Sequence, residues 1–203
     1  LSNGILAMPL KTEITRKDIL DMVAYEGIRS GRRAELANIK KIRRLALGPH
    51  ASFFFECYET MWYQIHEMLR IEKGGEEQIV GEIEAYNSLI PKGKELVATV
   101  MFEIPNSEER ARILSGLGGV EKTITMEIGE DIIQATAEED VDRTSAGGKA
   151  SSVHFMHFTL SSEQIYAFKN NNSQVTIRIE HVNYDHMAIM PKNIREELSK
   201  DLS

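Results

Sequence analysis

Five side chains suited to acid–base chemistry recur at helical spacing in one segment. They are Glu59, Tyr63, His66, Glu67 and Arg70. Residues three and four apart are neighbours on a helix surface, so we expect these five to share one face. A carboxylate tunes the pKa of a neighbouring imidazole and an arginine binds an oxyanion, which makes Glu67 and Arg70 candidate catalytic residues. The alternative is an exposed helix face with spaced opposite charges.

Histidines of the C-terminal half supply a second set of candidates. His154 and His157 are three apart, which on a strand directs them to opposite faces, so we do not expect them to bind one metal together. His181 continues an alternating apolar pattern and is followed by Tyr184. A strand histidine in apolar company is more often a hydrogen-bonded core residue than a ligand. If a metal site exists, we expect His154, His181 and one carboxylate of the helix face as ligands; nothing in the spacing requires one, so we expect no metal and no cofactor.

Familiar catalytic motifs are incomplete in this chain. The stretch GLGGVEKT (116–123) is one letter from a phosphate-binding loop, but Glu121 stands where the last glycine belongs. The expected order around it, helix and then strand, is also the reverse of such a loop, so we interpret its glycines as a helix end and a turn. His66-Glu67 lacks the second histidine of a zinc-protease motif, and Cys57 has no histidine nearby in sequence to activate it. No motif favours an enzyme.

The net charge of −7 is unevenly distributed. One segment carries seven basic residues and a single acid, Glu35: Arg29, Arg32, Arg33, Lys40, Lys41, Arg43 and Arg44. Its net charge of +6 leaves −13 for the rest of the chain. Such a contrast is typical of a docking patch for an acidic partner, and the alternative is a solvated helix face. No aromatic residue is interleaved with these bases, so we do not expect nucleic acid.

Composition is that of a globular protein. The 203 residues are 42% hydrophobic and 27% charged, and no stretch approaches the roughly 18 to 20 apolar residues of a membrane span. The single Cys57 excludes an internal disulfide and fits a reducing compartment. The first residues, LSNGILA, lack the basic start of a secretory signal, so we expect a cytoplasmic protein without membrane contact. The sequence leaves open whether the chain forms a homo-oligomer.

The N-terminal part is expected to be mostly helical, over residues 1–90. A capping pattern at Thr15–Asp18 predicts a helix that Gly31 ends, followed by a second helix over about 32–41. Two short apolar runs around Gly48-Pro49 predict a β-hairpin near 43–56. Further helices are expected over about 59–73 and 76–87, separated by two glycines, and a boundary follows near residues 90–93.

The C-terminal part, residues 91–203, reads as a duplication. Each half is expected to contain a strand, a helix that begins with Ser-Glu, and then two further strands. Ser107-Glu108 in the first half corresponds to Ser162-Glu163 in the second. We therefore predict an α+β fold in which two β-α-β-β units form a predominantly antiparallel sheet, packed with the helical part or as a second subdomain. The segment Glu138–Gly148 between them is expected to be a mobile loop.

Several segments together resemble a bacterial family known as domain of unknown function 3501. They are RRLALGPHASFFFE, YQIHEMLRIEK, EIEAYNSLIPKGKELVATVMFEIP and SVHFMHFTLSSEQIYAFKN, in that order. The resemblance implies a glutamine at the position of His66 and family histidines at His154 and His181. It also implies an association, because members are often encoded beside rubrerythrin-like and cysteine-rich iron–sulfur proteins. It implies no reaction.

Two functional hypotheses follow from these patterns. The first is a non-catalytic accessory protein that docks an acidic redox partner, a rubrerythrin or iron–sulfur protein, on the basic segment. The second is an enzyme or metal-binding protein with a site between the 59–70 helix face and the C-terminal sheet. The second hypothesis requires its candidate residues to converge in one pocket: Glu67, Arg70, His154, His181 and Tyr184.

Overall fold

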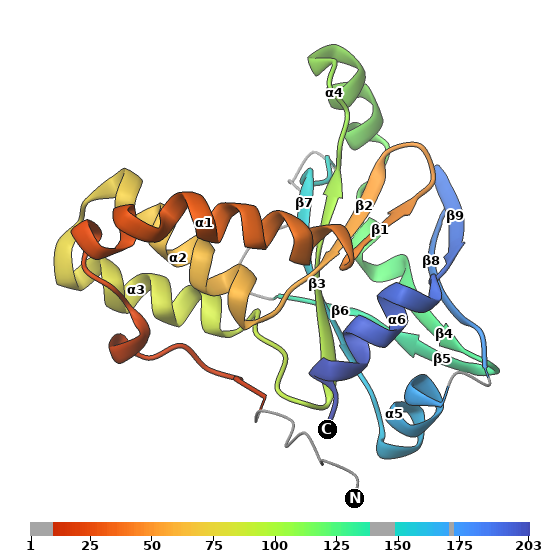
Figure 1. The fold of residues 1–203 in the computed structure, drawn as a ribbon. Coiled ribbons are helices and arrows are strands. Elements are labelled where there is room, and N and C mark those ends of the chain that lie inside the picture. The colour runs from red at the N-terminus through yellow and green to blue at the C-terminus, as the bar shows by residue number, and fades with distance from the viewer. Residues whose placement is uncertain (1–9, 139–148, 171–172) are drawn as a thin grey trace, which may run out of the picture.

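The computed structural model describes residues 10–138, 149–170 and 173–203, and within them the predicted α+β fold is confirmed. A layer of helices lies beside two antiparallel sheets (Figure 1). The helices are α1 (Met22–Lys41), α2 (Tyr58–Glu72), α3 (Gly75–Asn87), α4 (Ser107–Ser115), α5 (Ser162–Lys169) and α6 (Lys192–Leu198). The strands are β1 (Arg44–Leu47), β2 (Ala51–Phe55), β3 (Glu95–Phe102), β4 (Ile124–Ile128), β5 (Asp131–Gln134), β6 (Thr136–Ala137), β7 (Val153–Thr159), β8 (Val175–His181) and β9 (Tyr184–Ile189). Among these residues no helix is both long and apolar enough to cross a membrane.

Helix α1 is one helix where the sequence predicted two. Gly31 does not end it, because Tyr25 and Leu36, three turns apart, both bury their side chains on the side that faces α2. A glycine inside a helix costs only about 1 kcal/mol relative to alanine, and packing on both sides of it outweighs that cost. The helix begins at Asp21, whose side chain accepts hydrogen bonds from two backbone N–H groups. The capping pattern of Thr15 and Asp18 instead closes a short 3-10 turn.

The first sheet joins the N-terminal hairpin to the C-terminal half. Its strand order is β1-β2-β3-β7-β6, and β2 pairs with β3 over five residue pairs. The hairpin is confirmed, with Gly48 at φ +66° in its turn, a conformation that favours glycine. The sheet therefore crosses the boundary predicted near residue 90, and the division into two subdomains stays a prediction.

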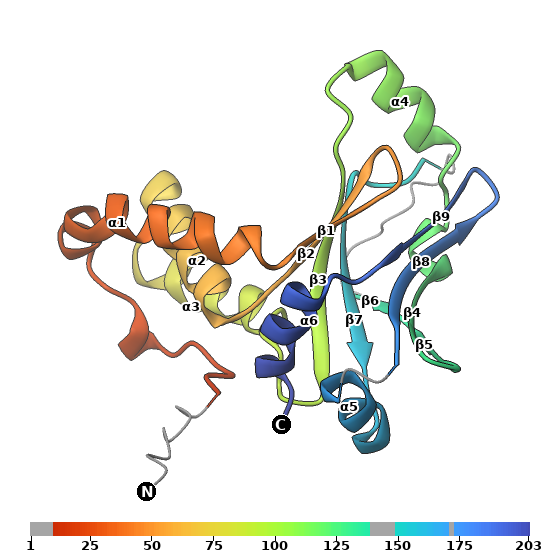
Figure 2. The same cartoon turned by 45° about the vertical axis from the view of Figure 1, so that its right-hand side comes forward.

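The two β-α-β-β units are present as β3-α4-β4-β5 and β7-α5-β8-β9. Each unit contributes its first strand to the first sheet and its last two strands to the second, whose order is β5-β4-β8-β9. Equivalent strands pair at the centre of both sheets, β3 with β7 and β4 with β8, which is the arrangement expected of a duplication. The two sheets are seen together on one side of the helical layer in Figure 2.

Two hydrophobic clusters hold these layers together. The larger lies between the sheets and includes Phe53 and Met156 of the first sheet and Ile177 of the second. The smaller joins the helices to the outer side of the first sheet, with Ile65 of α2 and Val97 of β3. The chain returns at its end to this junction, where the N–H of Ser203 donates to the carbonyl of Gly93.

The elements around the GLGGVEKT stretch occur in the predicted order, with a helix before it and a strand after it, which is the reverse of a phosphate-binding loop. Helix α4 precedes it, a short 3-10 turn at Val120–Thr123 ends it, and β4 follows. Gly119 has φ +80°, which accounts for a glycine there. The loop expected over Glu138–Gly148 lies, apart from Glu138, outside the described residues.

Candidate functional site

Glu67 is held by two residues of α1. Both oxygens of its carboxylate accept from Arg29, at 2.7 Å from Nε and 2.7 Å from Nη2, and one also accepts from the hydroxyl of Tyr25 at 2.7 Å. The hydrogen bonds from Arg29 are the main reason that the pKa of Glu67 falls to about 2. Burial and the bond to Glu67 raise the pKa of Tyr25. A carboxylate this fully engaged is a structural anion between α1 and α2.

This ion pair has a pH signature. Because the pKa of Glu67 is lowered on folding, its stabilising contribution is fully present above about pH 4.5 and is lost as pH falls towards about 2. We expect Glu67→Gln to lower the free energy of unfolding by about 1–3 kcal/mol at pH 7, with the deficit shrinking below pH 4.5. Urea denaturation across that range measures it, with the exposed Glu59→Gln on the same helix as the control. A deficit that does not depend on pH would contradict the role of the charge.

His66 does not lie on the exposed helix face where the sequence placed it. Its side chain is fully buried, against the rings of Trp62 and Tyr25. Nδ1 lies 2.7 Å from the carbonyl of Trp62, and Nε2 accepts the N–H of Leu20 at 3.1 Å, which defines the neutral tautomer with its proton on Nδ1. Burial lowers the pKa of His66. The residue joins α2 to the segment before α1, and no face remains for it to offer a substrate.

His154 and His181 occupy separate places on the sheets. His154 is fully buried beside the ring of Phe102, with Nε2 at 2.9 Å from the carbonyl of Ser151. His181 is partly buried at the end of β8, with Nε2 at 3.3 Å from the carbonyl of Gly118. Both histidines contact backbone carbonyls, as core histidines commonly do.

Tyr184 connects β9 to the hairpin turn. Its buried hydroxyl accepts from the N–H groups of His50 at 3.0 Å and Ala51 at 2.8 Å, and donates to the carbonyl of Leu47 at 2.7 Å. Burial is the main reason that its pKa is raised. The hydroxyl therefore has a full set of backbone partners, which makes Tyr184 a structural residue of the turn.

The site proposed between the 59–70 helix face and the sheet is not formed. Glu67 and Arg70 both pair with α1, Arg70 through Glu26, whereas His154 and His181 lie on the sheets without a shared partner. Among the described residues no group of three His, Cys, Asp or Glu side chains is placed to hold a metal ion. The prediction of convergence was wrong because the polar face of α2 packs on α1.

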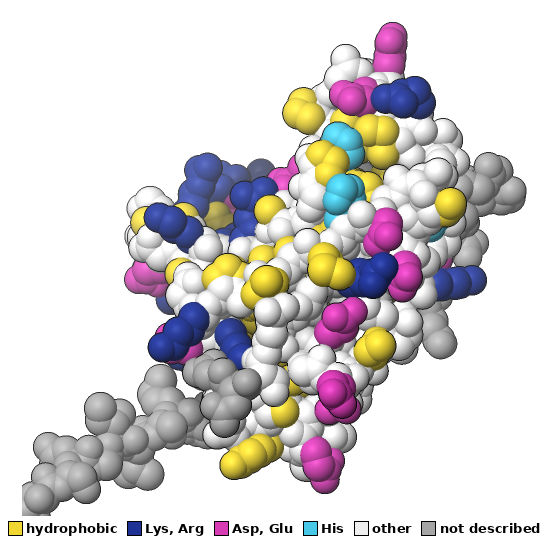
Figure 3. All heavy atoms as spheres, turned by 90° about the vertical axis from the view of Figure 1, so that its right-hand side faces the viewer, with side chains coloured by type: hydrophobic (Ala, Val, Ile, Leu, Met, Phe, Trp, Pro, Cys, Tyr) yellow, Lys and Arg dark blue, Asp and Glu magenta, His cyan; other side chains and the backbone are white. Residues whose placement is uncertain are grey.

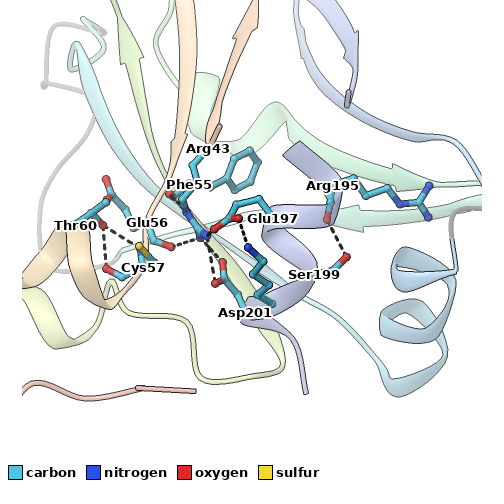
Figure 4. A network of polar contacts seen from close by, with 10 residues as sticks. Arg43, Phe55, Glu56, Cys57, Thr60, Arg195, Glu197, Ser199 and Asp201 are labelled. Carbon is cyan, nitrogen blue, oxygen red and sulfur yellow. Dashed lines mark hydrogen bonds and ion pairs between the residues drawn. The ribbon is translucent and has the colours of Figure 1, made fainter. Parts of the chain in front are cut away.

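Arg43 is buried, which corrects its place in the basic segment. Only 3% of it is exposed, and its guanidinium donates to the carbonyls of Phe55 and Glu56, both at 2.9 Å. It also pairs with Asp201 and, at 3.4 Å, with Glu197 of the C-terminal segment (Figure 4). The sequence did contain a signal for this burial. Side chains alternate along a strand with a period of two, which places Arg43 on the same side as the buried Leu45 and Leu47.

The lone cysteine lies close to this network. Cys57 is 7% exposed, and burial raises its pKa to about 11. At neutral pH it is therefore a protonated thiol, and a thiol is a poor nucleophile compared with a thiolate. Cys57 is a core residue at the start of α2.

Three further arginines of the basic segment have acidic partners. Arg29 pairs with Glu67, Arg32 pairs with Glu35 and lies over the ring of Trp62, and Arg44 pairs with Glu103. These pairs neutralise much of the charge that the sequence displays. The net +6 of the segment therefore overstates the charge available to a partner.

Arg33, Lys40 and Lys41 are the remaining cations of the segment. All three are exposed, and none has an acidic partner within ion-pair distance among the described residues. Lys40 and Lys41 follow Arg33 by seven and eight residues on α1, which is about two helical turns. The three side chains therefore share one side of the helix, which we call the basic face. Figure 3 shows another side of the molecule, the right-hand side of Figure 1, where acidic and basic side chains are both present.

His157 forms a cluster that the sequence did not predict. Nδ1 lies 3.0 Å from Glu95 and Nε2 lies 2.9 Å from Glu138, so the ring bridges two carboxylates. The hydrogen bond to Glu95 is the largest reason that the pKa of His157 is raised. No local signal indicates this cluster, because its members are 19 and 62 residues apart.

Comparison with known proteins assigns the chain to a family. The family model described as "Protein of unknown function (DUF3501)" matches residues 13–202. The chain belongs to this family. The DUF3501 chain is also similar to a crystal structure of a novel protein of unknown function from Burkholderia pseudomallei K96243. That match has 33% sequence identity and a TM-score of 0.86, and it covers 94% of this chain and 99% of that chain. The comparison with curated proteins found no match.

Family membership fits the structural role of His66. The resemblance implies glutamine at this position in other DUF3501 members, and a glutamine amide offers one acceptor and a donor, as the neutral imidazole does. Either side chain is therefore able to satisfy the carbonyl of Trp62 and the N–H of Leu20. The two hydrogen bonds by themselves account for a polar side chain at this buried position.

Proposed function

We propose that this DUF3501 protein is a non-catalytic docking protein that binds an acidic redox partner on the basic face of α1. The observation that carries the proposal is the exposure of Arg33, Lys40 and Lys41 on one side of a helix, without acidic partners among the described residues. Neighbouring arginines are paired, so these three are the cations left to attract another molecule.

The charge distribution supports an acidic partner over a neutral one. The chain carries −7 overall, so a cationic face is a local exception on an acidic surface. Such a face orients an acidic partner and accelerates encounter, and the effect is screened over about 8 Å at physiological ionic strength. Lys40 and Lys41 also stabilise the last turn of α1 through its dipole, an effect that leaves their ammonium groups accessible.

The redox character of the partner rests on the family resemblance. The resemblance implies that genes of this family often lie beside those of rubrerythrin-like and iron–sulfur proteins, and adjacent genes commonly encode proteins that act together. The proposal places the protein in the cytoplasm with such a partner. It assigns the chain no redox group of its own.

Charge reversal of the basic face tests the proposal. We expect Arg33→Glu, Lys40→Glu and Lys41→Glu together to weaken binding to the purified rubrerythrin-like protein of the same bacterium by about tenfold or more. Each exposed ion pair contributes about 0.2–1 kcal/mol, and reversal replaces attraction by repulsion. Calorimetric titration at low and physiological salt measures the affinity, which should fall with salt for the unmodified protein only.

A matched triple variant controls for net charge. Lys17→Glu, Lys94→Glu and Lys122→Glu change the net charge equally, and all three side chains are exposed and lie outside α1. This variant should retain most of the affinity. Equal losses in the two variants would show a non-specific charge effect, and full affinity in the basic-face variant would show that the partner binds elsewhere.

A further inference from the structure

An open cavity of about 250 Å³ lies where β8 begins, β9 ends and α6 begins. Its lining residues are Ser173, Gln174, Val175, Ile189, Met190, Lys192 and Arg195. Two of the seven are cationic and none is acidic, although the chain as a whole is strongly acidic. The cavity is therefore a cationic hollow whose apolar surface comes mainly from Ile189, which is 61% exposed, because Val175 and Met190 are 1% and 5% exposed. It lies on different elements from the basic face.

Arg195 is the unusual member of this lining. It is 6% exposed, and its guanidinium donates to the carbonyls of Phe168 at 2.6 Å, Ala167 at 2.7 Å and Ser173 at 2.5 Å. No carboxylate lies within ion-pair distance of it in the described part of the chain, in contrast to Arg43, which pairs with two. In Figure 4 the Arg195 side chain extends away from the Arg43 network.

The carbonyl contacts explain only part of this arrangement. Ala167 and Phe168 belong to the last turn of α5, so Arg195 closes that helix end. Carbonyl dipoles solvate a cation without cancelling its charge, and burial lowers the pKa of Arg195. Three of its five N–H bonds are engaged by these carbonyls, which leaves two for another acceptor. An anion in the cavity would supply both the missing charge and the acceptor.

We propose that this cavity binds a small organic carboxylate with a short apolar chain. The carboxylate pairs with Arg195 and with Lys192 at the rim, and the chain packs against the exposed side chain of Ile189. Lys192 is free to turn inward, because its ion pair with Glu196 is long, at 3.6 Å, and 78% of the lysine side chain is exposed. The volume is below the usual range of drug-sized pockets, about 300–1,000 Å³, which favours a ligand of few atoms.

Titration with butyrate and with inorganic phosphate, at constant ionic strength, tests the proposal on the full chain. Amide chemical shifts of Ser173, Gln174 and Lys192 report occupancy. We expect saturable binding of butyrate with a millimolar dissociation constant, and weaker binding of phosphate, which cannot use the apolar surface. Phosphate binding as tightly as butyrate would overturn the carboxylate assignment. Absence of saturable binding by either anion would overturn the site.

Two exposed substitutions test the site without disturbing Arg195. Ile189→Glu places a negative charge on the apolar surface, and Val182→Glu places the same charge at an exposed position in the β8–β9 turn; the two side chains are 61% and 91% exposed. We expect Ile189→Glu to weaken butyrate binding about tenfold, and Val182→Glu to leave it nearly unchanged. Lys192→Gln should weaken it about threefold, and Lys94→Gln should not. If Ile189→Glu and Val182→Glu weakened butyrate binding equally, the proposal would be contradicted. The same holds for Lys192→Gln and Lys94→Gln.

The basic-face variant separates this inference from the docking proposal. Arg33→Glu, Lys40→Glu and Lys41→Glu lie outside the cavity and should leave butyrate binding unchanged. Loss of protein docking with intact butyrate binding would support both proposals. Loss of butyrate binding in that variant would contradict the location of the site.

Discussion

Replacing Arg43 by methionine is expected to lower the free energy of unfolding by about 3–5 kcal/mol, because it leaves Asp201 buried without its cation. The carbonyls of Phe55 and Glu56 lose their donors in the same step. For a chain of this size the loss corresponds to a fall in Tm of about 6–20 °C. Thermal and urea denaturation, followed by circular dichroism, measure the effect.

The adjacent arginine supplies the matched control. Arg44 pairs with Glu103, but both side chains are nearly half exposed, so Arg44→Met should cost only about 0–1 kcal/mol. The two variants differ by one position and have the same chemistry. Similar losses in both would show that burial of the Arg43 network does not determine its contribution.

Replacing Tyr184 by phenylalanine is expected to cost about 2–4 kcal/mol, since one hydroxyl satisfies three backbone groups. Without it the N–H groups of His50 and Ala51 and the carbonyl of Leu47 lose a shared partner. The contact links the hairpin of the first sheet to β9 of the second, so the variant should also raise hydrogen exchange in that turn.

An exposed tyrosine provides the comparison for this prediction. Tyr166 is 72% exposed on α5, so Tyr166→Phe should change the free energy of unfolding by less than about 0.5 kcal/mol. A Tyr184→Phe variant as stable as Tyr166→Phe would show that water replaces the lost hydroxyl in the turn. Hydrogen exchange at His50 and Ala51 then distinguishes a rehydrated turn from an unchanged one.

Local sequence patterns predicted most of the elements. The hairpin around Gly48, the helix after Cys57 and the order of both β-α-β-β units depend on turn residues and on periods of 2 and 3.6, which are local properties. The same patterns failed at Gly31, where burial on both sides of the glycine outweighs its low helix propensity.

The candidate site was less predictable than the fold. The sequence identified the basic segment, but Arg43 pairs with Asp201 across 158 residues and Arg29 pairs with Glu67 across 38. A period read along the chain shows which side chains share a face, and it does not show what that face packs against. Only the structure shows which basic residues stay exposed without an acidic partner among the described residues, namely Arg33, Lys40 and Lys41.

By itself, therefore, the sequence determined the α+β class, the family and the order of the duplicated units, because each follows from residue types and spacings along the chain. Tertiary structure alone decided which charges are neutralised, where His66 is buried, and that Arg195 lines a cavity without an acidic partner among the described residues. Ion pairing and desolvation depend on distances of a few ångströms between distant segments, and only the packed fold sets those distances.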